Sequence, residues 1–248
     1  MLRVIQITDT HLYADPARRY YDVDTDATLR EVLARIAADE GSADLMLVTG
    51  DLVHDESAQG YARLRGYLAA LGLPVYCLPG NHDDVAIMRR VLTGDGVSCE
   101  DRVCRQGWQL ILLNSTVPGE VGGRLGEGEL ARLAACLQSR PDLHALVCLH
   151  HPPLPSGCAW LDEGLILDNP GALFAELARH DNVRGLLWGH IHQEFDRAHH
   201  GLRLLGTPST MLQFKPGAAE FAIDDKAPGY RWLDLHEDGR LETGVARL

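Results

Sequence analysis

Short apolar runs alternate along the chain with longer segments in which apolar residues recur at the spacing of a helix. The runs predict strands at 2–8, 44–49, 74–79, 97–104, 108–114, 143–149 and 183–188. The longer segments predict helices at 25–39, 57–71, 83–92, 127–138 and 170–180. This alternation favours an α/β fold in which largely parallel sheets are covered by helices and extended by antiparallel strands. Two mixed sheets packed face to face, with helices outside, fit the number of strands.

The tail of the chain, residues 194–246, has a different pattern and predicts antiparallel strands. Turn dipeptides punctuate it at His200-Gly201, Pro228-Gly229 and Asp238-Gly239. The chain of 248 residues shows no internal repeat, low-complexity tract or long linker. Its length is ordinary for one domain, so we expect a single domain over residues 1–248.

Polar residues stand where the first three predicted strands end. Asp9 and His11 follow the first strand, and alternation in an extended chain would place both side chains on one side. Asp51 follows the second strand after a glycine that allows a tight turn, and its two carboxylate oxygens suit it to bridge two cations. Asn81 and His82 follow the third strand; Asn81 offers a neutral carbonyl oxygen, and His82 points elsewhere on the turn.

Two later strands end in the same manner. His150 and His151 follow the strand at 143–149 and compete for one ligand position, for which His150 is preferred. The strand at 183–188 is followed by His190 and His192. Each motif alone has a structural explanation, such as a helix cap or a solvated histidine, but clustered carboxylates and imidazoles are costly to bury without cations. The predicted metal ligands are Asp9, His11, Asp51, Asn81, His150, His190 and His192.

Nitrogen and oxygen ligands without thiolate fit Mn, Fe, Zn or Co better than Ca or Mg. The net charge of −12 disfavours binding to nucleic acid or to acidic membranes. Six cysteines without a CxxC pair predict reduced thiols. No secretory signal and no apolar run near the ~20 residues of a membrane span is visible. A cytoplasmic protein without membrane contact is therefore expected.

The ordered set Asp-x-His, Gly-Asp, Gly-Asn-His-Asp, His and Gly-His-x-His resembles the calcineurin-like metallophosphoesterases. Neighbouring residues narrow the resemblance to bacterial class III 3′,5′-cyclic-AMP phosphodiesterases over about residues 2–247. The segments that carry it are Gln6–Leu12, His150–Pro155, Gly157–Asp162, Gly189–Glu194, Thr207–Thr210 and Gln213–Pro216. The chain stops soon after its last predicted strand, so the longer tail of some family members is not expected, nor is membrane contact through it.

The resemblance implies a four-layer α/β/β/α sandwich and two divalent metal ions, iron or manganese. By analogy Asp9, His11 and His192 hold one ion, Asn81, His150 and His190 hold the other, and Asp51 bridges them. A metal-bound hydroxide would attack the phosphorus of cyclic AMP and release 5′-AMP. His82 is the expected catalytic residue, donating a proton or hydrogen bond to the leaving oxygen or to a phosphoryl oxygen. The residues expected to contact substrate are His11, Asp51, Asn81, His82, His150 and His192.

Several alternatives stay open at this stage. The substrate could be another cyclic nucleotide, a glycerophosphodiester or, with less support, a lipid-A-pathway pyrophosphate; a non-catalytic scaffold is the alternative from another class. Asp83 or Asp55 could orient His82. Lys215, Trp160 and the loop 152–168 are candidates for base recognition. The remaining histidines are expected at the surface: His54, His144, His180, His199, His200 and His236. A homodimer, which some relatives form, is an expectation from resemblance alone.

Overall fold

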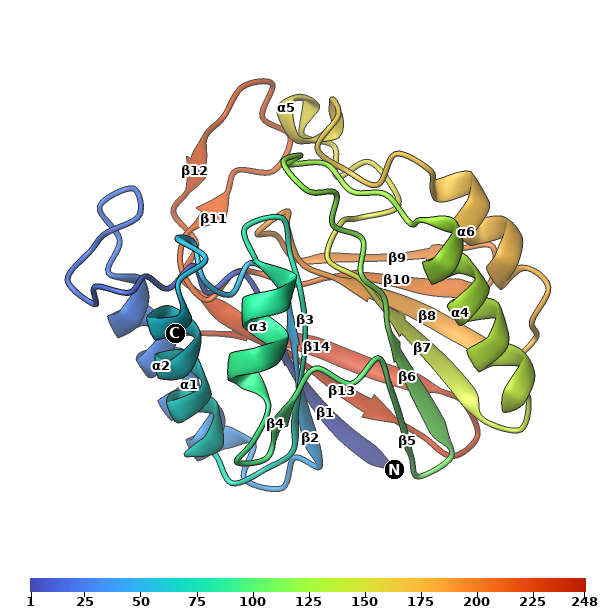
Figure 1. The fold of residues 1–248 in the computed structure, drawn as a ribbon. Coiled ribbons are helices and arrows are strands. Elements are labelled where there is room, and N and C mark those ends of the chain that lie inside the picture. Colours follow the sequence, from blue (N-terminus) through green and yellow to red (C-terminus); the bar gives the residue numbers. More distant parts are fainter.

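A computed structural model describes residues 1–248 and contains two six-stranded mixed sheets that pack face to face (Figure 1). The first sheet has the strand order β14 (Leu241–Arg247), β13 (Gly229–Leu235), β1 (Leu2–Ile7), β2 (Leu45–Thr49), β3 (Val75–Leu78) and β4 (Val97–Ser98). The second has the order β5 (Arg102–Arg105), β6 (Trp108–Leu112), β7 (His144–Cys148), β8 (Val183–Trp188), β10 (Leu202–Gly206) and β9 (Phe195–His199). Strands β1–β4 run parallel, as do β6, β7, β8 and β10.

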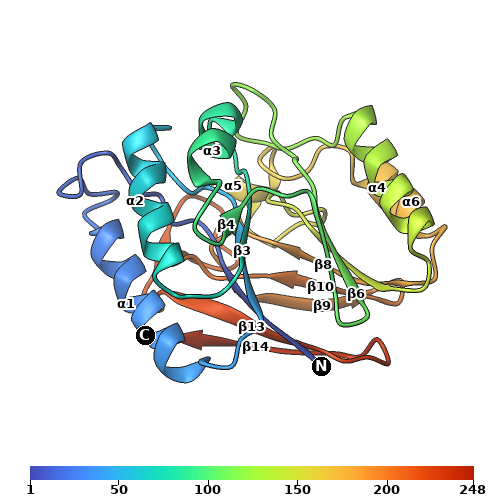
Figure 2. The same cartoon turned by 60° about the horizontal axis from the view of Figure 1, so that its bottom comes forward.

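Helices form the two outer layers, as Figures 1 and 2 show. The first sheet is covered by α1 (Thr25–Asp39), α2 (Ala58–Ala69) and α3 (Val85–Leu92), and the second by α4 (Glu127–Ser139) and α6 (Pro170–Leu177). A short helix, α5 (Ala159–Asp162), and a two-stranded hairpin, β11 (Gln213–Phe214) with β12 (Ile223–Asp224), complete the fold. The predicted α/β/β/α sandwich is confirmed.

Three apolar clusters separate these four layers. Strand β2 is apolar from Leu45 to Val48 because both of its faces are buried. Met46 and Val48 belong to the cluster that packs with α1 and α2, whereas Leu45 and Leu47 belong to the cluster between the sheets. A strand buried on both faces has no polar side to alternate. None of the helices combines the length and the apolar character that crossing a bilayer would require.

Three details of the sequence prediction are wrong. The strand predicted at 97–104 is two strands, β4 and β5, which belong to different sheets. The tail is not wholly antiparallel, because β10 inserts beside β8 and runs parallel to it. Pro228-Gly229 is not a turn, since Gly229 opens β13. Burial in either sheet leaves the same apolar signature, so the pattern cannot tell which sheet a short strand joins.

Polar side chains tie the two sheets together under the end where the site forms. The Gln6 amide, on β1, donates hydrogen bonds to Thr49 Oγ1 at 2.7 Å and to the Trp188 carbonyl of the other sheet at 3.1 Å. Arg231, fully buried on β13, donates to the Gly206 carbonyl at 2.8 Å. These bonds fix the carboxyl ends of the two sets of parallel strands relative to each other, which is where binding loops gather in such sheets.

Candidate metal centre

The loops after β1, β2, β3, β7 and β8 bring the seven predicted ligand residues to one place. His192 Nε2 lies 3.2 Å from Asp9 Oδ1. His11 Nε2 lies 3.6 Å from Asp51 Oδ2, and His150 Nε2 lies 3.3 Å from Asp51 Oδ1. Each oxygen of Asp51 therefore faces a different histidine. Two triads made only of predicted ligands have ligand atoms within 4.8 Å of one another: Asp9, His11 and His192, and Asp9, Asp51 and His150.

The backbone reaches this arrangement through turns and not through extended strands. Five of the seven residues have positive φ: Asp9 at 54°, His11 at 43°, Asp51 at 53°, His190 at 67° and His192 at 48°. The expectation that alternation in an extended chain pairs Asp9 with His11 is wrong, because β1 ends at Ile7. Left-handed conformations at non-glycine residues are costly and gather at functional sites, where surrounding structure enforces them.

Glycines beside the ligands make room for close approach. Gly50 has φ 93°, and a β-carbon there would overlap the ring of His150. A β-carbon at Gly80 would overlap the carboxylate and the backbone nitrogen of Asp51. Both glycines are thus needed because a side chain of another residue occupies the space.

Two of the histidines are held by one ring nitrogen while the other faces the centre. His150 Nδ1 bonds the Thr49 carbonyl at 2.8 Å, and His192 Nδ1 bonds the Leu212 carbonyl at 3.0 Å. Anchoring a histidine by a backbone carbonyl is the usual support for a metal ligand. His151 differs, since Ser115 Oγ and the Val121 carbonyl occupy both of its ring nitrogens. The geometry therefore favours His150 over His151 for the ligand position.

Three buried polar atoms in the cluster have no protein partner: His11 Nε2, His190 Nε2 and Asn81 Oδ1. An unpaired buried polar atom costs roughly 1–3 kcal/mol, and folded proteins rarely tolerate several in one place. All three can donate a lone pair. The donor set of imidazole nitrogens, carboxylates and an amide oxygen therefore fits divalent transition-metal ions.

The charges within the cluster depend on one another. Burial alone would lower the pKa of His150, but the Asp51 carboxylate beside it raises that pKa to about 9. Burial would raise the pKa of Asp51, yet His150 and His11 hold it well below its usual range. Burial lowers the pKa of His11 and of His190 well below the ordinary value, so both present neutral rings. The Asp51 carboxylate is ionised and the His11 and His190 imidazoles are unprotonated, which is the state in which these groups bind metal, whereas His150 would have to release a proton when an ion binds.

A cavity of about 140 Å³ opens beside the cluster. Its lining combines aromatic and aliphatic side chains with polar residues of the cluster, namely His11, Asp51, Asn81, His82, His190 and His192. Trp160, from the loop predicted to contact the base, lies in the aromatic wall, and α5, which the sequence did not predict, carries it. Lys215 does not line the cavity, and no Lys or Arg does.

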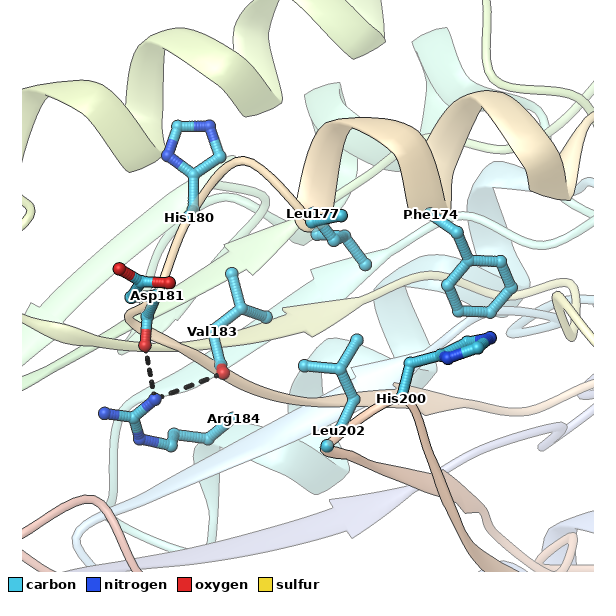
Figure 3. Close-up of a pocket in the computed structure, with 10 residues that line it drawn as sticks. Phe174, Leu177, His180, Asp181, Val183, Arg184, His200 and Leu202 are labelled. Atoms are coloured by element: carbon cyan, nitrogen blue, oxygen red, sulfur yellow. Dashed lines mark hydrogen bonds between the residues drawn. The ribbon is translucent and has the colours of Figure 1, made fainter.

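A larger cavity of about 550 Å³ lies between α6 and the β9–β10 hairpin (Figure 3). Its wall includes Phe174, Leu177 and Leu202, and the Arg184 guanidinium in it donates to the carbonyl of Asp181 at 2.7 Å. None of the residues predicted as ligands reaches this cavity, which lies at the amino end of β8. It therefore does not compete with the buried cluster as the site of chemistry.

A family model described as calcineurin-like phosphoesterase matches residues 2–194, which include every residue of the cluster. The chain belongs to the calcineurin-like phosphoesterase family. This family uses a dinuclear metal centre, and the cluster holds the histidine and aspartate groups that such a centre needs. The predicted family membership is confirmed.

Relatives of the chain carry names that agree with the closer resemblance. The 3′,5′-cyclic adenosine monophosphate phosphodiesterase CpdA of Pseudomonas aeruginosa is 44% identical over 99% of this chain and 89% of its own length. The 3′,5′-cyclic-nucleotide phosphodiesterase alr5338 of Nostoc sp. is 39% identical over 100% of this chain and 92% of its own length. A dimetal phosphatase from Danio rerio has the same fold, with a TM-score of 0.66, 15% identity and coverage of 99% of this chain and 98% of that one.

His54, which the sequence analysis predicted at the surface, lies beside the cluster. His54 is only partly exposed, stacks on the His82 ring with centroids 4.4 Å apart, and approaches His11. Neither carboxylate proposed to orient His82 does so. Asp83 accepts hydrogen bonds from the backbone of Leu52, Val53 and Gly80 and from Tyr61, and Asp55 bonds Ala14 and Ser57. Nothing in the sequence around His54 indicates its contacts, which depend on the packing of separate loops.

Proposed function

We propose that this chain hydrolyses 3′,5′-cyclic AMP to 5′-AMP with two divalent metal ions. The observation that carries the proposal is the convergence of seven ligand-type side chains, three of which have buried polar atoms without a protein partner. The names of the relatives, at 37–44% identity over the whole chain, support the substrate. A ring of ligands this complete also argues against a non-catalytic scaffold.

The residues that would hold the ions follow from their neighbours. We assign Asp9, His11 and His192 to one ion, Asn81, His150 and His190 to the other, and Asp51 to both. Iron or manganese is the expected metal. When bound, two such ions neutralise charge on the phosphate oxygens and lower the pKa of a nearby water.

The chain's own groups supply the rest of the chemistry. His82 lines the cavity, and its backbone N–H donates to Asp51 Oδ1 at 2.9 Å, which fixes the turn that carries its ring. We assign to this ring the proton that the 3′ oxygen needs when the bond from phosphorus to that oxygen breaks. His11, Asp51, Asn81, His150 and His192 would contact the phosphate side of the substrate.

The electrostatic setting suits a substrate with a single negative charge. No Lys or Arg lines the cavity, so it offers no side-chain cation for a second phosphate group. The net charge of −12 disfavours a nucleic-acid substrate. We expect the enzyme to act on the free nucleotide in the cytoplasm, away from membranes. A homodimer stays a prediction, which sedimentation of the purified enzyme would test.

A substrate panel on the manganese- or iron-loaded enzyme tests the proposal. Cyclic AMP, cyclic GMP, 2′,3′-cyclic AMP and glycerophosphodiesters would be compared by kcat/KM, with products identified by chromatography. We expect cyclic AMP to give 5′-AMP and to rank at or near the top. A loaded enzyme that leaves cyclic AMP intact while it cleaves glycerophosphodiesters would overturn the assignment and favour that alternative.

A further inference from the structure

Aromatic rings of the cavity lining follow one another from His11 to His192, whose own rings lie 5.5 Å apart. Tyr20 stacks on His11 with centroids 5.1 Å apart and planes at 14°. Phe214 stacks on His192 at 4.1 Å and 9°. The rings between them touch in sequence at 4.7 to 5.3 Å. We call this set the aromatic collar: Tyr20, Tyr21, Phe221, Trp160 and Phe214.

The collar is assembled from three distant segments. Tyr20 and Tyr21 precede α1, Trp160 lies on α5, and Phe214 and Phe221 belong to the β11–β12 hairpin. Figure 1 shows α5, β11 and β12 grouped at one end of the molecule. Segments far apart in sequence therefore converge on a ring of aromatic faces beside the metal-binding cluster.

Two members of the collar are exposed and stack on each other at its outer edge. Tyr21 is 54% exposed and Phe221 is 43% exposed, and their centroids lie 5.1 Å apart with planes at 28°. Large aromatic side chains in solvent that line a cavity typically mark a binding surface. Both residues line the cavity beside the cluster.

The lining of the cavity places a base next to the collar. The same cavity of about 140 Å³ is lined by predicted metal ligands and by all five collar residues. A cyclic nucleotide whose phosphate lies at the ligands therefore has its base beside the collar. The wall it meets there is aromatic and aliphatic and offers a flat apolar face.

We propose that the aromatic collar is the base subsite, in which a purine packs against the exposed aromatic surface of Tyr21 and Phe221. This inference rests on the proposed phosphodiesterase activity and names the residues that would contact the base of its substrate. Purines are favoured over pyrimidines because their larger ring system covers more of the stacked pair.

Replacement of the exposed rings tests the subsite without disturbing the core. Phe221→Leu and Tyr21→Leu keep apolar bulk but remove the flat face. The measured quantity is the ratio of kcat/KM for cyclic AMP to kcat/KM for a base-free analogue, methyl riboside 3′,5′-cyclic phosphate, followed by phosphorus NMR. We expect this ratio to fall roughly tenfold in each variant, mainly through KM for cyclic AMP, as loss of one base-stacking contact implies. Ile223→Ala, on the same hairpin, exposed and outside the cavity, is the control and keeps the wild-type ratio.

The outcomes separate the subsite from the activity itself. An unchanged ratio in both leucine variants would overturn the subsite. So would a wild-type enzyme that cleaves cyclic AMP no faster than the base-free analogue, or cyclic UMP as well as cyclic AMP. If the wild-type enzyme cleaves the base-free analogue and other small diesters but not cyclic AMP, both the substrate assignment and the base subsite are wrong.

Discussion

The Nδ1 atoms of His11 and His54 lie 3.2 Å apart, and this contact leaves His11 Nε2 as the free atom that faces Asp51. Burial, together with the neighbouring His82, lowers the pKa of His54 to about 4, so its ring is neutral and one of its nitrogens can accept a hydrogen bond. The arrangement fits a tautomer in which His11 Nδ1–H donates to His54 and Nε2 keeps its lone pair. His54 thus acts on the metal centre through His11.

Replacement of His54 should therefore weaken metal binding. We expect His54→Ala to lower the affinity for Mn²⁺ by roughly 10- to 100-fold, because loss of a partner that orients a ligand typically has that effect. Calorimetric titration of metal-free protein measures it. His200→Ala, an exposed histidine on the β9–β10 turn, should bind as the wild type does. Equal affinity in the two variants would exclude an orienting role.

His82 is expected to act on substrate and not on metal. His82→Ala should lower kcat by roughly 10²- to 10⁴-fold, the usual contribution of a general acid. The metal content should stay at the wild-type level, because the ring is outside the assigned ligand set. Elemental analysis and steady-state kinetics on the same preparation separate the two effects. A variant with nearly unchanged kcat would remove His82 from the mechanism.

The buried ring of His151 should make stability depend on pH. Burial lowers the pKa of His151 to about 3, against 6.5 for an ordinary histidine. Below pH 6.5 the His151 ring binds a proton in the unfolded chain but stays unprotonated in the folded one. The free energy of unfolding therefore decreases progressively from pH 6.5 toward pH 3. At pH 5 the loss amounts to about 2 kcal/mol.

The variant His151→Gln isolates this effect, since a carboxamide can bond both Ser115 and the Val121 carbonyl without titrating. Urea unfolding of metal-free wild type and variant at pH 7 and pH 5 gives the four free energies of unfolding. The free energy of unfolding of the wild type minus that of the variant should be about 2 kcal/mol smaller at pH 5 than at pH 7. The same difference at both pH values would mean that His151 is not the group that titrates.

The sequence predicted the order of the main helices and strands because their burial leaves a periodic signature. Strand β2 and helix α1 illustrate this, with bounds within a residue of those expected. The pattern of apolar residues could not show that β4 joins the first sheet and β5 the second, or that β10 inserts beside β8. Those choices depend on contacts between segments far apart in the chain, which no local pattern records.

The sequence also predicted part of the candidate site. The seven ligand-type residues converge, as the strand-end argument expected, but the reason given for Asp9 and His11 was wrong, since both have left-handed backbone conformations. His54 and the rings of Tyr21 and Phe221 were missed. Their role depends on packing across distant loops, and a histidine or an aromatic residue in a loop carries no sign of its partner.

The central claim is that Asp51 is shared by two ions, and electron paramagnetic resonance of the Mn²⁺-loaded enzyme tests it most directly. Bridged manganese ions are magnetically coupled and lose the resolved hyperfine spectrum of an isolated ion. We predict two ions per chain and a coupled spectrum for the wild type, and for Asp51→Asn a loss of one ion or of the coupling. A wild-type spectrum of isolated Mn²⁺ with one ion per chain, or an unchanged coupled pair in Asp51→Asn, would contradict the account.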